Sequence, residues 1–362
     1  ALRNELLGQW RKLKMLRRHS PLVKKFLTGI DAAANELHTP PEVFAPLYRY
    51  CRHEGVKNFT YHAGEDFVTL SGGIRAVYEA ATFLKLRNGD RIGHGTAIGI
   101  DPKLWLKRSP KVLYVKRGDY IDDLVFAYFL LSGKPKFLDV VQKISSKLNE
   151  QIPYLYPKAA LNLDNFVKAW KLRELDARLL LPSSLRDAET SLIKEEEKEA
   201  SRFKDEREKN ALAFELFAQY HSSETIAAGQ QIIDVKTKLI PEKALKYMQQ
   251  RCMKLLRERE IVLEVPVTSN LRISLYESHE EHHLFRWLRN TPKEPRMNVV
   301  LGSDDPGIFA TNVQNDLEHI HRVLEAKSGK HGFETRKEIT RLLQNGNIYR
   351  FRSEEVINSP DF

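Results

Sequence analysis

The sequence predicts an α/β fold built on a parallel sheet and interrupted by a large helical insertion. Short apolar runs that end in polar, glycine-containing turns recur along the chain, and a helical pattern separates most of them. Strands that alternate with helices are typical of βαβ units, each of which takes about 30 residues. The spacing between the runs follows this period with one exception, which indicates the insertion.

Composition and charge narrow the class of protein. The 362 residues are 42% hydrophobic and 29% charged, as in ordinary globular proteins, and they suffice for a large barrel or two domains. Cys51 and Cys252 form no metal or disulfide pattern, so we expect a reducing, cytoplasmic location. The longest apolar run, residues 124–131, is too short to cross a membrane.

The net charge of +10 comes from basic residues spread among many acids, without a basic stripe. We therefore do not expect nucleic acid as a direct substrate, whereas a phosphate-bearing substrate or an acidic partner stays open.

The predicted elements follow in order. Residues 1–19 read as an amphipathic helix, and five apolar runs then predict strands: "KKFLTGIDAAANE", "KNFTYHAGED", "DRIGHGT", "EIVLEVPVTSN" and "MNVVLGSDDPG". Successive runs lie roughly 31 to 35 residues apart, except for a gap that exceeds the period by roughly 140 residues. This gap places the insertion at about residues 105–245. It contains three helical patterns and a charged stretch that turns apolar at Ala211 and is expected to pack on the core or on another subunit.

The ends of the predicted strands carry polar side chains suited to chemistry. In parallel α/β folds, functional groups collect at the carboxyl ends of the strands. The residues found there are Asp31, His62, Glu65, His94, Ser269, Asn270, Asp304 and Asp305. Imidazole and carboxylate together suit Zn²⁺, and a metal with an open position acidifies a bound water. The alternatives are a structural role for each histidine and a helix cap for the acid before Pro306.

Four motifs in this order resemble the adenosine deaminase family of metal-dependent amidohydrolases: "TYHAGE", "RIGHG", "LEVPVTSN" and "GSDDP". The stretch "GIDAAANE" (29–36) resembles that family's GxDLxGxE. The resemblance covers about residues 25–105 and 245–352, and it implies that the five strands are the fourth to eighth of a TIM-type (β/α)₈ barrel. It implies a barrel part at 1–104, a helical insertion at 105–245, and a second barrel part with C-terminal helices at 246–362.

By matching position, the resemblance implies the catalytic roles. His62 and Asp304 would bind Zn²⁺, and Asp304 would also accept a proton. Glu65 would protonate the purine ring nitrogen beside the attacked carbon, for which it has to carry a proton. His94 would orient the water and help to deprotonate it. Hydroxide would then add to the amine-bearing carbon, and ammonia would leave.

The same resemblance implies the substrate contacts. Asp305 would accept a hydrogen bond from the purine, and Asp31 and Ala34 belong to the stretch that meets the substrate. Ala34 replaces the glycine of the family motif, so its methyl group is expected either to crowd the base or to alter the loop. Ala63 stands where AMP deaminases have cysteine, which favours adenosine or deoxyadenosine over a phosphorylated form.

Two further metal ligands of the family, an H-x-H pair on the first barrel strand, have no counterpart before the first predicted strand. We expect them in an N-terminal part that precedes this sequence. His319 and His321 form an H-x-H, but on a predicted helix, where i and i+2 point about 200° apart. The alternative is a half-barrel that has lost its metal and acts as a scaffold or pseudoenzyme.

A second pattern, "HEEHH" (279–283), fits the H-E-x-x-H of zinc proteases. The match is short and offers no obvious third ligand downstream, so the deaminase interpretation is the stronger one.

The size of the insertion predicts a homo-oligomer and a partner protein. In this respect the chain resembles the shell-forming deaminase of the RADAR anti-phage system, which implies a role in antiviral defence.

Overall fold

A computed structural model describes residues 2–33, 35–177, 198, 201, 208, 210–289, 291–328 and 332–351. The five predicted strands form one sheet in the order β1-β2-β3-β6-β7, and all four pairings are parallel. They are β1 (Gly29–Ala32), β2 (Asn58–Ala63), β3 (Arg91–His94), β6 (Val262–Pro266) and β7 (Asn298–Gly302). The prediction of a parallel α/β fold is therefore confirmed.

The sheet is open among the described strands, because β1 and β7 pair with β2 and β6 alone. Five strands are too few to close a (β/α)₈ barrel, so an open sheet is the expected result. A mixed α/β chain with a parallel sheet and mostly helical content agrees with a TIM-type fold.

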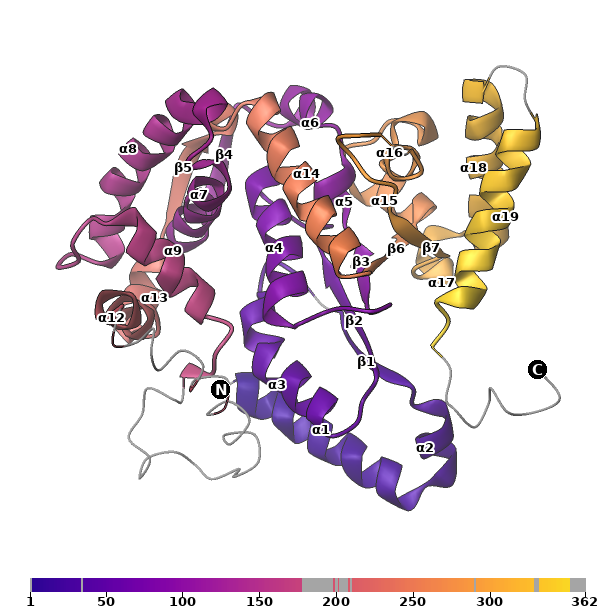
Figure 1. Cartoon of the computed structure of the whole chain (residues 1–362), viewed down its shortest axis with the longest axis horizontal. Coiled ribbons are helices and arrows are strands. Elements are labelled where there is room, and N and C mark those ends of the chain that lie inside the picture. Colours follow the sequence, from indigo (N-terminus) through magenta and orange to yellow (C-terminus); the bar gives the residue numbers. More distant parts are fainter. Residues whose placement is uncertain are drawn as a thin grey trace.

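One face of the middle of the sheet is buried. Phe59 and Tyr61 of β2, Ile92 of β3, and Leu263 and Val265 of β6 are all buried, and the strand register places them on this same face. On the opposite face, His62, Arg91 and Glu264 are only partly buried. Figure 1 shows α4 and α14 lying across the sheet. The helices between these strands and along the sheet are α3 (Pro41–His53), α4 (Leu70–Phe83), α5 (Thr96–Gly99), α6 (Pro102–Arg108), α14 (Glu242–Glu258), α15 (Val267–Ile273), η5 (His279–Glu281), α16 (Leu284–Trp287) and α17 (Pro306–Phe309).

The segment between α6 and α14 forms a separate group of elements, on the left of Figure 1. Its helices are α7 (Arg117–Leu131), η1 (Pro135–Phe137), α8 (Leu138–Leu155), α9 (Leu163–Leu172), α12 (Ala211–Tyr220), α13 (Ser223–Gly229) and η4 (Thr237–Leu239). Helix α7 packs on α4, and Tyr220 at the end of α12 donates a hydrogen bond to Glu42 of α3. The apolar face after Ala211 therefore packs within this chain. Most of the charged stretch before it lies outside the described residues.

This segment also contains two strands that the sequence analysis did not predict. β4 (Val112–Lys116) and β5 (Ile232–Lys236) pair antiparallel, although more than 100 residues separate them. β4 reads VLYVK and β5 reads IIDVK, so each has a short apolar run, but each buries only one side chain, Val115 in β4 and Val235 in β5.

The two ends of the chain are helical. α1 (Leu2–His19) confirms the predicted amphipathic helix and packs on α3, with α2 (Pro21–Phe26) beside it. At the other end, α18 (Val313–Ser328) and α19 (Gly332–Ile348) pack together, and α19 lies against β7. The two ends lie on opposite sides of the sheet, as Figure 1 shows.

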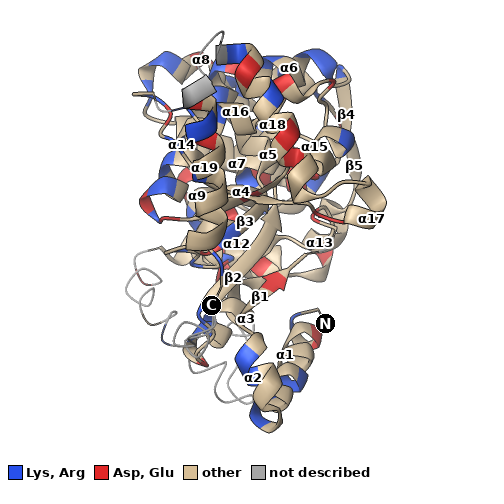
Figure 2. Ribbon diagram, turned by 90° about the vertical axis from the view of Figure 1, so that its right-hand side faces the viewer, with Lys and Arg blue, Asp and Glu red and all other residues tan. Residues whose placement is uncertain are grey.

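The charged residues are distributed in line with the composition. In Figure 2, basic segments occur on helices at both ends of the view and alternate with acidic ones. Within the described ranges, no helix has the length and apolar character needed to span a bilayer.

Candidate active site

The carboxyl ends of the strands bring the predicted residues to one edge of the sheet. His94 is the last residue of β3, and Asp304 follows β7 by two positions. Both have a left-handed backbone, with φ of 61° and 55°. This conformation is uncommon for residues other than glycine and concentrates at functional sites.

Three predicted residues meet there. The ligand atoms of Glu65, His94 and Asp304 all lie within 4.8 Å of one another. Nδ1 of His94 lies 2.8 Å from Oε1 of Glu65 and 2.9 Å from Nδ2 of Asn270. The same Asn270 amide donates to Oε1 of Glu65 at 3.2 Å. Asn270 therefore contacts both partners and holds the imidazole and the carboxyl group next to each other.

Ser269 and Asn270 come from the "VTSN" that follows β6. Sequence analysis placed both at a strand end but gave neither a role. The Ser269 hydroxyl donates to Oδ2 of Asp304 at 2.5 Å, and both Ser269 and Asn270 are fully buried. Ser269 and Asn270 are neighbours in sequence, so together they connect Asp304, which follows β7, with Glu65 and His94.

Asp305 occupies the N-cap position of α17, with Pro306 in the first turn, as the alternative interpretation expected. Its carboxylate makes no capping hydrogen bond, so this side chain stays available for another partner. Ala34 lies outside the described residues.

His62 lies next to the three-residue cluster. Its ring centroid is 5.3 Å from that of His94, and its Nδ1 is 3.3 Å from Oδ1 of Asp31, too poorly aligned for a hydrogen bond. Burial lowers the pKa of His62, but the neighbouring carboxylates of Asp31, Glu264 and Glu36 together more than offset this, and the net shift is upward. The ring rests on Gly93, where a Cβ would lie 2.6 Å from its Cδ2. Glycine at position 93 thus makes room for this histidine.

Glu36 is a site residue that the sequence analysis missed. Its Oε2 accepts the Gly64 N–H at 2.6 Å, and both carboxylate oxygens lie within 3.3 Å of the Glu65 nitrogen. Burial raises the pKa of Glu36 to about 7. The available signal was its place as the last residue of "GIDAAANE", the stretch that carries Asp31.

A divalent metal ion fits the donor types at this edge. One imidazole and two carboxylates converge, and within the described part of the chain no Lys or Arg forms an ion pair with Glu65, Asp304 or Asp305. The buried Nδ1 of His62 has no aligned hydrogen-bond partner. Imidazole nitrogen and carboxylate oxygen are donors that Zn²⁺ accepts.

The rival histidine patterns have a different geometry. His279 lies in a 3₁₀ turn and His283 follows it, so the two do not share an α-helical face. His319 and His321 lie on α18, as predicted, where His319 stacks on His279 and His321 contacts Glu325. Among the described residues, neither pair joins a metal-ligand cluster.

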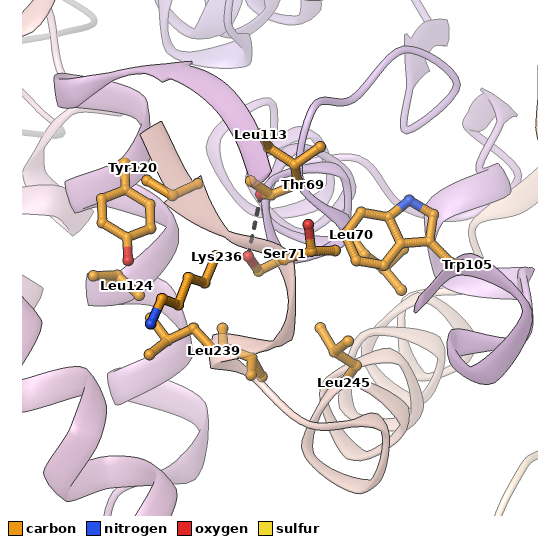
Figure 3. Close-up of a pocket in the computed structure, with 13 residues that line it drawn as sticks. Thr69, Leu70, Ser71, Trp105, Leu113, Tyr120, Leu124, Lys236, Leu239 and Leu245 are labelled. Carbon is orange, nitrogen blue, oxygen red and sulfur yellow. Dashed lines mark hydrogen bonds between the residues drawn. The ribbon is translucent and has the colours of Figure 1, made fainter. Parts of the chain in front are cut away.

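A small cavity and a larger one lie where the segment between α6 and α14 meets α4. Figure 3 shows a cavity of about 30 Å³ between the start of α4 and the β4–β5 pair, lined mainly by apolar side chains. It has room for little more than a water molecule. A larger cavity of about 290 Å³ has Glu36 and Asp66 in its wall, so it adjoins the strand-end cluster.

Comparison with known proteins identifies the chain's relatives. A family model described as adenosine deaminase matches residues 195–355, a range that contains Ser269, Asn270, Asp304 and Asp305. The chain is also similar to an adenine deaminase from Chlorobium luteolum, with 40% identity over 81 residues. That match spans 22% of this chain and 21% of the relative's length.

Proposed function

We propose that the chain takes part in the metal-dependent, hydrolytic deamination of a purine, because residues 195–355 match the adenosine deaminase family and a further stretch is similar to an adenine deaminase. The observation that carries this proposal is the convergence of Glu65, His94 and Asp304 within 4.8 Å at the carboxyl edge of the sheet. An acid, a base and a further carboxylate at one point can protonate a ring nitrogen and remove a proton from water.

Each residue has a distinct task in this proposal. Glu65 donates a proton to the purine ring nitrogen, and Asn270 holds its carboxyl group through a hydrogen bond. His94, buried and in contact with Glu65, takes a proton from the attacking water. Asp304, fixed by Ser269, accepts a proton, and Asp305 accepts a hydrogen bond from the base.

His62 and Asp304 are the residues of this chain that we propose hold the metal, with two histidines expected from preceding sequence. When bound, a zinc-like cation lowers the pKa of a water so that it becomes a nucleophile near neutral pH.

The proposed substrate is adenosine or deoxyadenosine. Ala63, in place of the cysteine typical of AMP deaminases, supports a substrate without phosphate. The relative in Chlorobium luteolum is named an adenine deaminase, so the free base belongs in the same assay.

The test is an assay of the full-length protein for ammonia and the deaminated purine, with adenosine, deoxyadenosine, AMP and adenine as substrates. Glu65→Gln removes the proposed acid, and Glu258→Gln on the exposed face of α14 is the matched control. We expect activity in the wild type and the control and its loss in Glu65→Gln. Equal activity of all three proteins with metal bound contradicts the role of Glu65. A metal-loaded wild type that deaminates none of the four substrates supports the pseudoenzyme instead.

We also propose that residues 105–245 are the insertion into a barrel whose fourth to eighth strands lie in this chain. Assembly into a homo-oligomer through this segment, a partner protein and a cytoplasmic location belong to the same proposal. Light scattering tests the assembly, and a monomer at all concentrations contradicts it.

A further inference from the structure

We propose that Glu36 is a positioning residue that holds the turn after β2 and thereby aims Glu65 at His94. This inference rests on the proposed function, since it concerns the same site. Glu36 itself touches neither His94 nor Asn270 in a hydrogen bond; it acts on the backbone that carries Glu65.

The turn needs an acceptor at this place. β2 ends at Ala63, and Gly64 then adopts a left-handed backbone with φ of 80°. The N–H groups of Gly64 and Glu65 consequently leave the sheet ladder and point toward one group. Successive N–H groups in such a conformation form a concavity that binds anions, and buried N–H groups require a partner. The carboxylate of Glu36 supplies it, at 2.6 Å from one nitrogen and 3.2 Å from the other.

The turn controls the direction of the Glu65 side chain. Glu65 has to leave the backbone on the side of β3 for its Oε1 to reach Nδ1 of His94 at 2.8 Å. Gly64 has no Cβ to limit the rotation of its backbone. Without Glu36, the N–H groups of Gly64 and Glu65 would lose this acceptor, and the backbone that carries the Glu65 side chain would be less restrained. A misplacement of about 1 Å can lower a catalytic rate on the order of 100-fold.

Glycine at position 64 is fixed by packing as well. A Cβ there would lie 2.6 Å from Cγ2 of Val77 on α4, so the chain cannot stiffen this turn with a larger residue. The Gly64 carbonyl accepts the Ala97 N–H at 2.8 Å, so what the turn still needs is an acceptor for its own N–H groups. Glu36 comes from the loop after β1, the neighbouring strand, which places its carboxylate across from the end of β2.

The wall of the large cavity offers a matched control. Glu36 and Glu42 both line the cavity of about 290 Å³, but Glu42 accepts a hydrogen bond from Tyr220 and has no contact with the turn. Glu36→Ala and Glu42→Gln therefore change the same cavity wall, and only the first removes the acceptor of the turn. Glu36→Gln keeps one carbonyl oxygen and is the conservative variant.

The experiment combines hydrogen exchange, kinetics and structure on the full-length protein. We expect the amides of Gly64 and Glu65 to exchange faster in Glu36→Ala, by about 10-fold or more, and to stay protected in Glu42→Gln. With adenosine, kcat should fall about 10- to 100-fold in Glu36→Ala with little change in KM, and Glu36→Gln should recover part of it.

Unchanged exchange in Glu36→Ala overturns the inference, and so does faster exchange with unchanged kcat. A wild type that deaminates no purine refutes the proposed function, but the positioning role of Glu36 is then tested separately by structure. A crystal structure of Glu36→Ala then decides: Glu65 still within hydrogen-bond distance of His94 overturns the positioning role, and a displaced Glu65 supports it.

Discussion

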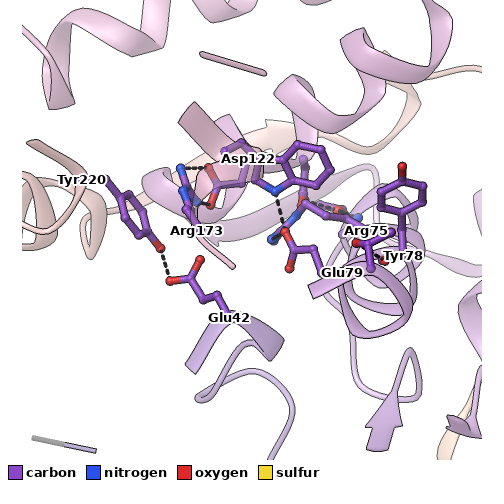
Figure 4. A network of polar contacts seen from close by, with 12 residues as sticks. Glu42, Arg75, Tyr78, Glu79, Asp122, Arg173 and Tyr220 are labelled. Carbon is purple, nitrogen blue, oxygen red and sulfur yellow. Dashed lines mark hydrogen bonds and ion pairs between the residues drawn. The ribbon is translucent and has the colours of Figure 1, made fainter. Parts of the chain in front are cut away.

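Two regions of this molecule each bring several carboxylates close together, but the side chains that accompany the carboxylates differ. Where the segment between α6 and α14 meets α3 and α4, the buried acids Glu42, Glu79, Asp122 and Asp123 each accept a hydrogen bond from a side chain; Figure 4 shows this for Glu42, Glu79 and Asp122. The hydrogen bonds run from Arg173 to Asp122, from Arg75 and Trp170 to Glu79, from Arg75 and Thr69 to Asp123, and from Tyr220 to Glu42.

At the carboxyl edge of the sheet, no Arg or Lys of the described residues pairs with Glu65 or Asp304. Their partners are an imidazole, an amide and a hydroxyl. Acids paired with a donor have their buried charge compensated and depend on that partner, whereas acids that converge without a cation keep a capacity for protons or for a metal. The residue types are alike, and the partners decide the role.

The largest expected effect separates the two regions by activity. Glu65→Gln should lower kcat/KM for the proposed substrate by about 100- to 10,000-fold, the usual contribution of a general acid. Its melting temperature should stay close to that of the wild type, because Glu65 joins no Arg or Lys in the described structure. Steady-state kinetics and calorimetry measure the two. A variant that loses stability as well would place Glu65 with the structural acids.

The second expected effect is a loss of stability when an ion pair in the first region, Arg173 with Asp122, is broken. Arg173→Met should leave the buried Asp122 carboxylate without its bidentate partner and reduce the free energy of unfolding by about 3 to 5 kcal/mol. Denaturant unfolding measures this loss. The double variant Asp122→Leu/Arg173→Met should recover much of it, since both buried charges are then removed. No recovery would show that packing of Arg173 on Tyr220, rather than the charge pair, provides the stability.

The third effect concerns the metal. Asp304→Asn should weaken metal binding by at least about 10- to 100-fold, the loss that follows even from changing an outer partner of a ligand. Asp123→Asn, a change of the same chemistry in the paired region, should leave the bound metal unchanged. Metal analysis after dialysis against a weak chelator distinguishes them. Equal metal content in both variants would remove Asp304 from the ligand set.

The smallest effect is a pH dependence of stability. Burial raises the pKa of Glu42 to about 7, from an ordinary value of 4.5. The folded state therefore binds more protons than the unfolded state between about pH 4.5 and 7, and stability falls as pH rises through this window. Glu42→Gln keeps an acceptor for Tyr220 but cannot ionise, so its loss of stability over the window should be smaller, by about 1 to 3 kcal/mol. Parallel unfolding curves for both proteins across this range would contradict the shift.

The comparison also separates what the sequence could predict from what it could not. The five parallel strands were predictable because each is a local apolar run with its polar residues at one end. Strands β4 and β5 were not predicted: each is a short apolar run among helical patterns, each buries one side chain, and each pairs with a strand more than 100 residues away. Local patterns carry no information on a pairing of that kind.

The candidate site divides in the same manner. Glu65, His94 and Asp304 were placed together by the rule that strand ends share one edge, and the structure brings them within 4.8 Å. Their catalytic roles stay predictions. Glu36 was missed because its partners are the backbone N–H groups of Gly64 and Glu65, which lie far along the chain. A single carboxylate in a loop sequence gives no signal of such a contact.

The His62 ring of β2 lies directly against the backbone of Gly93 in β3, so the side chains allowed at these two positions depend on each other. Any side chain at 93 would push the imidazole away, so relatives that keep a histidine at 62 are expected to keep glycine at 93, and relatives that lose one are free to lose the other. Joint variation at these two positions would therefore distinguish relatives that kept the chemistry from relatives that kept only the fold.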